Sequence, residues 1–310
     1  MPAGSSGLLR KAASPLRTNT LSPKPTALSG QSENSHMIDV NDYRENGFVL
    51  AKGFFPPEEV EQIYADAREV FTLQMRRLGI VASRAPSESE FEAGMFKLFE
   101  ADLQTFANCG KQAQHLISLH RLSLDKRIVS ALKGLGLEFP NISTRPLLYF
   151  NAERLAKKEV YWRLDVHQDW RSMQGSLDSV VVWLPLIDID KTLGALQVYP
   201  GSHKWGLLEA EIVDGYGHLR SDLDKAKLIS VEVERGDALF FSTLLVHQSG
   251  TNVSPSIRWS CHFRYNNLSE PTFIERGFPH PYLYKPQSDL ITPNFPSPTE
   301  VRKIFDSGES

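Results

Sequence analysis

The stretch that decides the fold is residues 236–265, GDALFFSTLLVHQSGTNVSPSIRWSCHFRY. It holds three short apolar segments, at 238–241, 244–246 and 257–265, which are separated by glycine, proline, asparagine and serine. Short segments rich in valine, leucine and aromatic residues with such punctuation are typical of strands in β-sandwiches, jelly rolls and barrels. We therefore predict that this part of the chain forms strands of an all-β core.

The same pattern extends back to about residue 141, so the predicted β core covers residues 141–268. Further short strands are predicted at 48–50, 146–150, 179–184, 195–199 and 228–233. Residues 37–140 mostly follow a helical period instead, and Pro56 and Pro57 mark the start of a helix that runs to about Leu78. Other helices are predicted at 90–108, 111–119 and 124–134. The fold class is therefore mainly β with a helical N-terminal half, α+β, and we expect the helical half to support the core and to lack the site.

The two ends of the chain differ from its middle. Residues 1–36 contain seven serines and four prolines and carry a net charge of +3. Such a segment buries too little apolar surface to offset the entropy of ordering it, so we expect a disordered tail or a misassigned start before Met37. An organelle-targeting segment is the alternative, because the tail is poor in acidic residues. Residues 269–310 are rich in proline and are expected to wrap over the core.

The composition excludes several classes of protein. The chain has 310 residues, of which 41% are hydrophobic and 23% are charged, as in ordinary globular proteins. Its longest apolar run, 180–187, is too short to cross a bilayer. A net charge of −3 gives no basic field for nucleic acid. With two cysteines, Cys109 and Cys261, there is no disulfide framework, and we predict a reducing, cytoplasmic location.

Candidate metal ligands lie in two motifs that are far apart in the sequence. The first is His167-Gln168-Asp169, and on a strand residues i and i+2 point to the same side, so its imidazole and carboxylate can converge on one ion. The second contains His247, which follows an apolar segment and could supply a third ligand. Two histidines and one carboxylate leave open positions on an octahedral metal, and that ligand set selects non-haem Fe(II) oxygenase chemistry.

Arg258 lies eleven residues after His247, on the next predicted strand. A buried guanidinium there would need an anionic partner, and a dicarboxylate cosubstrate would provide one through a bidentate fork, with Ser249 as a possible second donor. Taken singly, each motif has a plainer interpretation as a surface strand, a core histidine or a surface charge, and it is their conjunction that favours a site. His262 shares the strand face of Arg258 and either lines the pocket or is a hydrogen-bonded core histidine.

The order of these motifs resembles that of a known family. The matching segments are His167-Gln168-Asp169, Trp183-Leu184-Pro185-Leu186, residues 194–204 (GALQVYPGSHK), Gly236-Asp237, His247-Gln248-Ser249 and Arg258. Together they resemble the phytanoyl-CoA dioxygenase family of Fe(II)/2-oxoglutarate-dependent oxygenases, and the resemblance covers roughly residues 40–268. The resemblance implies a double-stranded β-helix, that is a jelly-roll, cupin-like core flanked by helices, and a single oxygenase domain over 37–310.

The resemblance also implies roles for individual residues. His167, Asp169 and His247 would bind iron, and Arg258 would bind a carboxylate of 2-oxoglutarate, so these four are the predicted catalytic residues. Further cosubstrate contacts are implied at Ser249 and Trp183, and at Tyr149 or Asn151 on the strand before the first motif. The implied cofactors are Fe(II), 2-oxoglutarate as cosubstrate and O₂.

The activity implied is hydroxylation, or another oxidation, of a C–H bond in a small molecule with release of succinate and CO₂. Related halogenating enzymes have a small residue in place of Asp169, so hydroxylation is favoured. A cupin-like metal-dependent isomerase or lyase and a non-catalytic binding module on the same scaffold are the alternatives. The expected substrate walls are residues 79–120, 151–163 and 205–224, and bases within 154–163 either attract an acidic substrate or form a solvated loop. The sequence identifies neither the substrate nor the oligomeric state.

Overall fold

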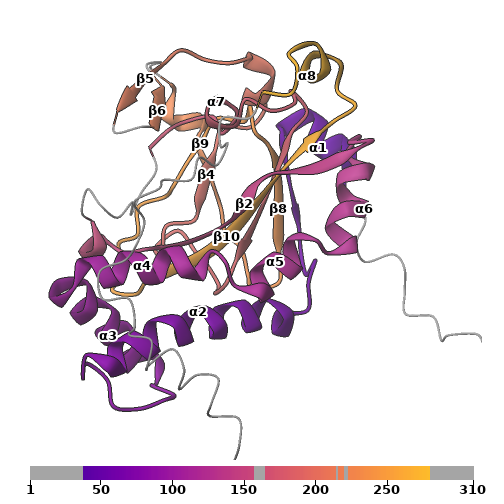
Figure 1. The fold of residues 1–310 in the computed structure, drawn as a ribbon. Coiled ribbons are helices and arrows are strands. Elements are labelled where there is room, and N and C mark those ends of the chain that lie inside the picture. Colours follow the sequence, from indigo (N-terminus) through magenta and orange to yellow (C-terminus); the bar gives the residue numbers. More distant parts are fainter. Residues whose placement is uncertain (1–37, 157–164, 214–215, 220–222, 280–310) are drawn as a thin grey trace, which may run out of the picture. The chain divides into compact units, whose positions relative to one another are not determined.

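Most helices lie before residue 140 and most strands lie after it, as the helical and strand patterns of the sequence predict (Figure 1). The computed structural model describes residues 38–156, 165–213, 216–219 and 223–279. The predictions for the tail 1–36 and for residues 280–310 of the C-terminal wrap lie outside these ranges. None of the helices within them is long and apolar enough to span a membrane.

The larger sheet is antiparallel throughout and has the strand order β1-β8-β3-β10-β2. Its strands are Phe48–Ala51 (β1), Pro140–Asn151 (β2), Val180–Pro185 (β3), Ala238–Ser242 (β8) and Arg258–Asn267 (β10). A second antiparallel sheet, of order β7-β4-β9, contains Leu196–Val198 (β4), Ile229–Val231 (β7) and His247–Gln248 (β9). A separate pair is formed by Ala210–Val213 (β5) and Tyr216–Leu219 (β6).

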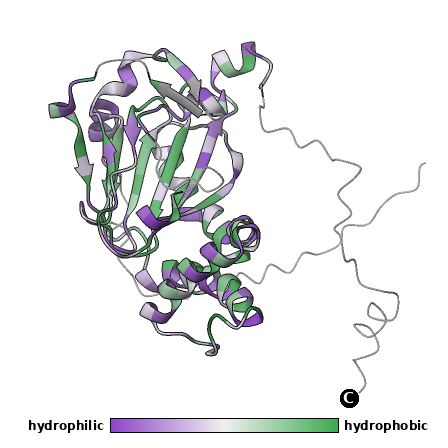
Figure 2. Ribbon diagram, turned by 90° about the vertical axis from the view of Figure 1, so that its left-hand side faces the viewer, coloured by the Kyte–Doolittle hydropathy of each residue, from purple (hydrophilic) through white to green (hydrophobic). Residues whose placement is uncertain are grey.

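Strand β3 is buried on both faces, and its side chains point alternately into two separate apolar clusters. Its even-numbered residues pack into a cluster with the helices, whereas Val181 and Trp183 pack into a second cluster with residues of β4 and β7. Successive side chains of a strand point to opposite faces, so a strand with a core on each side is apolar at every position. Figure 2 shows the central strands coloured as hydrophobic. The second cluster joins the two sheets, and the site described below lies beside it.

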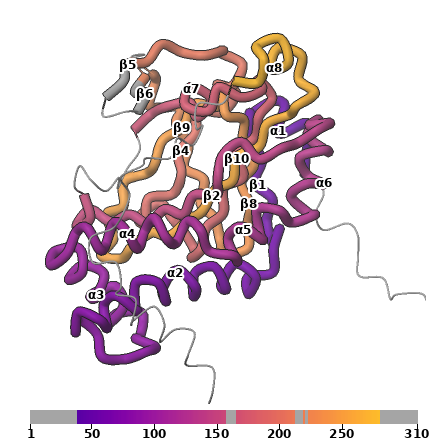
Figure 3. The backbone as a smooth tube through the Cα atoms, in the orientation of Figure 1, coloured from indigo at the N-terminus to yellow at the C-terminus, as the bar shows by residue number. Residues whose placement is uncertain are grey.

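Helices cover the side of the larger sheet that faces the first cluster (Figures 1 and 3). They are Pro57–Arg77 (α2), Glu88–Ala101 (α3), Leu103–Ala113 (α4), Ile117–Ser123 (α5) and Lys126–Gly134 (α6). Short helices at Val40–Asn46 (α1), Trp170–Met173 (α7) and Pro271–Glu275 (α8) and 3₁₀ turns at Glu153–Leu155, Ser202–Trp205 and Lys225–Lys227 complete the described elements. The fully buried Trp259 of β10 packs against Tyr64 and Phe71 of α2, which ties the helices to the sheet.

The structure confirms the α+β class and corrects several predicted elements. The helical pattern at 90–108 is two helices, because Asp102 ends α3 and its carboxylate accepts a hydrogen bond from Thr105 N at 2.9 Å, at the start of α4. The strand predicted at 244–246 is a turn closed by the Leu245 N–Ser242 O bond of 2.9 Å, and the strand begins at His247 instead. The helix predicted at 111–119 is divided between the end of α4 and the start of α5.

Trp259→Ala should lower the free energy of unfolding by about 3–5 kcal/mol, because it removes a large ring from a fully packed core. Phe139→Ala is the matched control, since this aromatic side chain is 61% exposed, and it should change the free energy by less than about 0.5 kcal/mol. Urea unfolding measures both. Similar losses in the two variants would contradict the assignment of Trp259 as the link between helices and sheet.

Candidate metal centre

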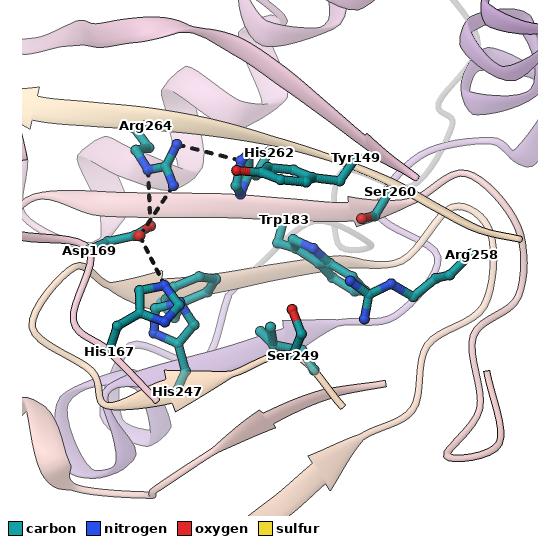
Figure 4. A pocket seen from close by; sticks show the side chains of 12 residues that line it. Tyr149, His167, Asp169, Trp183, His247, Ser249, Arg258, Ser260, His262 and Arg264 are labelled. Carbon is teal, nitrogen blue, oxygen red and sulfur yellow. Dashed lines mark hydrogen bonds and ion pairs between the residues drawn. The ribbon is translucent and has the colours of Figure 1, made fainter. Parts of the chain in front are cut away.

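Most of the polar residues that the sequence analysis named as site candidates line one pocket between the two sheets (Figure 4). Its lining residues are Tyr149, His167, Asp169, Trp183, Leu196, Phe241, His247, Ser249, Arg258, Ser260, His262 and Arg264. Strand β10 contributes every second residue from Arg258 to Arg264 to this pocket, while its alternate residues pack into the helix-side core. The period of two in a strand thus places one polar face of β10 on the site.

His167 and His247 are brought together by their own backbones. His167 N donates to His247 O at 2.9 Å, and His247 N donates to His167 O at 3.1 Å. This is the reciprocal pair of an antiparallel ladder, in which the two Cα atoms lie about 5.5 Å apart. The two rings follow, with centroids 4.2 Å apart, and Phe241 packs against the His247 ring at 4.9 Å.

The hydrogen bonds of the two imidazoles fix which nitrogen is free to bind a metal. Nδ1 of His167 lies 2.6 Å from Asp165 O, and Nδ1 of His247 lies 2.9 Å from Leu245 O. A carbonyl oxygen only accepts, so both Nδ1 atoms are assigned a hydrogen, and Nε2 is the nitrogen of each neutral ring that can bind a metal. Burial, and then the positive charge that His167 can carry, lower the pKa of His247 to about 3, so this ring is neutral at pH 7.

Asp169 reaches the histidines from a turn and not from a strand. Its backbone has φ −61° and ψ −32°, at the start of α7, whereas the sequence prediction placed both ends of His167-Gln168-Asp169 on one strand face. The carboxylate still converges, since its Oδ1 lies 3.5 Å from His167 Nε2, and the ligand atoms of His167, Asp169 and His247 all lie within 4.8 Å of one another.

Gln168, between the two ligands, fixes the motif to the neighbouring loops. Its Nε2 donates to Gly206 O at 2.8 Å and to Leu244 O at 2.6 Å, and its Oε1 accepts from Leu208 N at 2.9 Å. A fully hydrogen-bonded buried amide is rigid, so the residues on either side of it are held in place.

Arg264 is a charged residue of the site that the sequence analysis missed. Its Nε donates to Asp169 Oδ2 at 2.9 Å and its Nη2 donates to Asp169 Oδ1 at 3.2 Å (Figure 4). Burial by itself would raise the pKa of Asp169, but the charge of Arg264 and the contact with His167 hold that pKa well below its usual range. A signal was present, because Arg258, His262 and Arg264 share one strand face at even spacing.

Arg258 is buried and has no carboxylate partner among the described residues. One Nη donates to Gly194 O, while Nε has no hydrogen-bond partner. Burial lowers the pKa of Arg258 to about 10, and it therefore stays charged at pH 7. Position 194 requires glycine, because its φ is +86° and a Cβ there would lie 2.8 Å from Gly250 O. A buried, partly unsatisfied guanidinium of this kind fits an anionic ligand.

The remaining predicted cosubstrate contacts divide into two groups. Ser249, Trp183 and Tyr149 line the pocket, whereas Asn151 lies opposite Arg258 in the β2–β10 register and is not among the lining residues. His262 is both buried and part of the lining, and it meets the Tyr149 ring edge-on with centroids 4.8 Å apart.

A family model described as phytanoyl-CoA dioxygenase (PhyH) matches residues 43–260. The chain belongs to this family. The human "Phytanoyl-CoA dioxygenase, peroxisomal" is 25% identical over 232 residues, a match that covers 71% of this chain and 66% of the human protein. The rice "Phytanoyl-CoA dioxygenase 1" is 32% identical over 113 residues, 34% of this chain and 40% of the rice protein.

A solved structure of similar fold is the epimerase SnoN in complex with Fe³⁺, alpha ketoglutarate and nogalamycin RO. It has a TM-score of 0.50 and 18% sequence identity, and the match covers 74% of this chain and 82% of that one. The family assignment agrees with the predicted resemblance. The predicted cofactors, iron and 2-oxoglutarate, are confirmed by the family assignment together with the convergence of His167, Asp169 and His247.

The free energy of unfolding of the metal-free protein should fall as the pH falls from 7 to 5. The unfolded state takes up a proton on His247 near its ordinary pKa of about 6.5, whereas the folded state excludes that proton down to about 3. His247 alone therefore contributes a loss of about 2 kcal/mol over this range.

The measurement is urea unfolding with a chelator present, at pH 7 and pH 5, for the wild type and His247→Gln. The glutamine variant should lose about 2 kcal/mol less than the wild type between the two pH values. An equal loss in both proteins would show that His247 is not held neutral by burial.

Proposed function

We propose that this protein is an Fe(II)/2-oxoglutarate-dependent oxygenase that hydroxylates, or otherwise oxidises, a C–H bond of a small molecule. The observation that supports this most directly is the meeting of two features in one pocket. A His167–Asp169–His247 ligand set lies near one end of the pocket, and the buried cation of Arg258 lines the same pocket. An ion and a dicarboxylate can therefore be bound at the same time.

The donor set fits iron. Two neutral imidazoles and one carboxylate form the facial ligand set of non-haem Fe(II) oxygenases, which leaves open coordination positions. When bound, the iron would supply O₂ activation coupled to the oxidative decarboxylation of 2-oxoglutarate to succinate and CO₂. The carboxylate of Asp169 also favours hydroxylation over halogenation, because a halide position would require a small residue there.

Arg258 would hold the far carboxylate of 2-oxoglutarate. Its Nε has no hydrogen-bond partner in the structure, and a bidentate guanidinium–carboxylate fork would use it. Ser249 and Tyr149 line the same pocket and would supply hydroxyl contacts, while Trp183 would close one wall. These residues bind and orient the cosubstrate and exclude water, and the metal and cosubstrate carry the difficult chemistry.

The family's shared core supports the finer fold assignment as well. We infer that the two facing sheets form the double-stranded β-helix expected of the family, with the site between them. The substrate class proposed is a small molecule. Parts of the expected substrate walls, residues 157–163, 214–215 and 220–222, lie outside the described residues, so the proposal does not extend to a particular substrate or to a CoA ester.

Loss of a triad ligand should weaken metal binding strongly without unfolding the protein. His167→Ala, Asp169→Ala and His247→Ala should each raise the Fe(II) dissociation constant by at least about 100-fold and eliminate succinate formation, because each removes one of three ligands. Circular dichroism verifies the fold. Metal binding unchanged in all three variants would exclude the proposed centre.

Arg258→Ala should raise the 2-oxoglutarate concentration needed for half-saturation by about 30- to 5,000-fold, because truncating one partner of a buried charge pair costs about 2–5 kcal/mol. Anaerobic titration with 2-oxoglutarate of the Fe(II)-loaded protein, followed by the weak visible charge-transfer band, measures this. Arg145→Ala, which removes an arginine outside the pocket lining, is the control and should titrate like the wild type. Unchanged 2-oxoglutarate affinity in Arg258→Ala would refute the role given to Arg258.

A further inference from the structure

Two arginines of β10 line the pocket, and they have different partners. Arg258 forms no ion pair among the described residues, whereas Arg264 forms a two-point ion pair with Asp169. Both members of that pair are buried, with side-chain exposures of 8% for Arg264 and 5% for Asp169. The proposed cosubstrate site accounts for Arg258 and leaves Arg264 without a role.

The Arg264 fork constrains the orientation of the carboxylate. The terminal torsion of an aspartate is broad, so an unsupported carboxylate samples many orientations. Here Nε binds Oδ2 at 2.9 Å and Nη2 binds Oδ1 at 3.2 Å, which fixes the plane of the carboxylate. The fixed orientation leaves Oδ1 at 3.5 Å from His167 Nε2, on the side of the two imidazoles.

Arg264 is itself supported from the other side. Its Nη1 lies 3.5 Å from His262 Nε2, and His262 packs edge-on against Tyr149 (Figure 4). Burial, and then the charge of Arg264, lower the pKa of His262 well below its usual range, so this ring is neutral and Nε2 can accept. A line of contacts therefore runs from β2 through β10 to the carboxylate.

We propose that Arg264 is a positioning residue that holds the Asp169 carboxylate in the orientation required of a metal ligand. This inference rests on the proposed metal site. It differs from simple charge compensation, in which any cation opposite Asp169 would serve. If charge were the whole effect, a lysine at position 264 would support metal binding as well as arginine does. If orientation dominates, loss of the planar fork weakens metal binding even when the charge is kept, as loss of a supporting contact to a metal ligand typically does.

The test is Co(II) binding to the metal-free protein, since Co(II) is stable in air and reports its ligands by absorption. Arg264→Lys keeps the charge and loses the planar fork, and Arg264→Met loses both. The matched control is Arg127→Lys, because Arg127 holds Asp125 by the same fork, with Nε and Nη2 at 2.8 and 2.7 Å from the carboxylate oxygens, away from the pocket. Circular dichroism establishes that each variant is folded at the temperature of the titration.

The Co(II) dissociation constant should rise by about 10- to 100-fold in both Arg264 variants and stay at the wild-type value in Arg127→Lys. Wild-type affinity in Arg264→Lys, or tighter binding in Arg264→Met, would overturn the inference and leave the proposed function intact. Failure of the wild type to bind Co(II) would overturn both. If the methionine variant does not fold, the lysine variant decides, because it keeps a cation opposite the buried carboxylate.

Discussion

The site depends on one reciprocal pair of backbone hydrogen bonds, between His167 and His247. Side-chain contacts at the end of flexible chains could not by themselves bring two such distant parts of the sequence together with a fixed geometry. This pair of bonds places the two Cα atoms opposite each other. The carbonyl of Asp165 then orients the His167 ring, and the carbonyl of Leu245 orients the His247 ring. Ring orientation and tautomer are thus consequences of backbone placement.

Charge balance explains the rest of the pocket. A buried carboxylate is costly without a partner, and the fork of Arg264 together with His167 stabilises its ionised form. Arg258 is equally buried but has only the Gly194 carbonyl as an acceptor, so its stabilisation is incomplete until an anion binds. Strand β10 therefore carries Arg264, which forms an ion pair with Asp169, and Arg258, whose only acceptor among the described residues is a carbonyl oxygen. Both residues are at even spacing on the face opposite Trp259 and Cys261.

The sequence predicted the parts of the site that spacing and residue type encode. His167, Asp169, His247 and Arg258 were predicted because their identities and order select one kind of chemistry, and the structure places all four around one pocket. Strands β3, β8 and β10 were predicted because apolar runs define them. The turn at Asp169 was not predicted, because the sequence of a His-x-Asp motif does not distinguish a strand from the start of a helix. The turn at 244–246 was misread as a strand because Leu245 and Val246 are buried by tertiary packing and not by strand pairing. Arg264 was missed because its partner is known only once Asp169 has been placed.

The most direct test of the account is a crystal structure of the protein grown without oxygen in the presence of Fe(II) and 2-oxoglutarate, with anomalous diffraction recorded at the iron edge. The account predicts a single strong anomalous peak bound by Nε2 of His167, Nε2 of His247 and a carboxylate oxygen of Asp169, with the far carboxylate of 2-oxoglutarate against Arg258. A peak elsewhere, ligation through Nδ1, or a 2-oxoglutarate that does not reach Arg258 would contradict it.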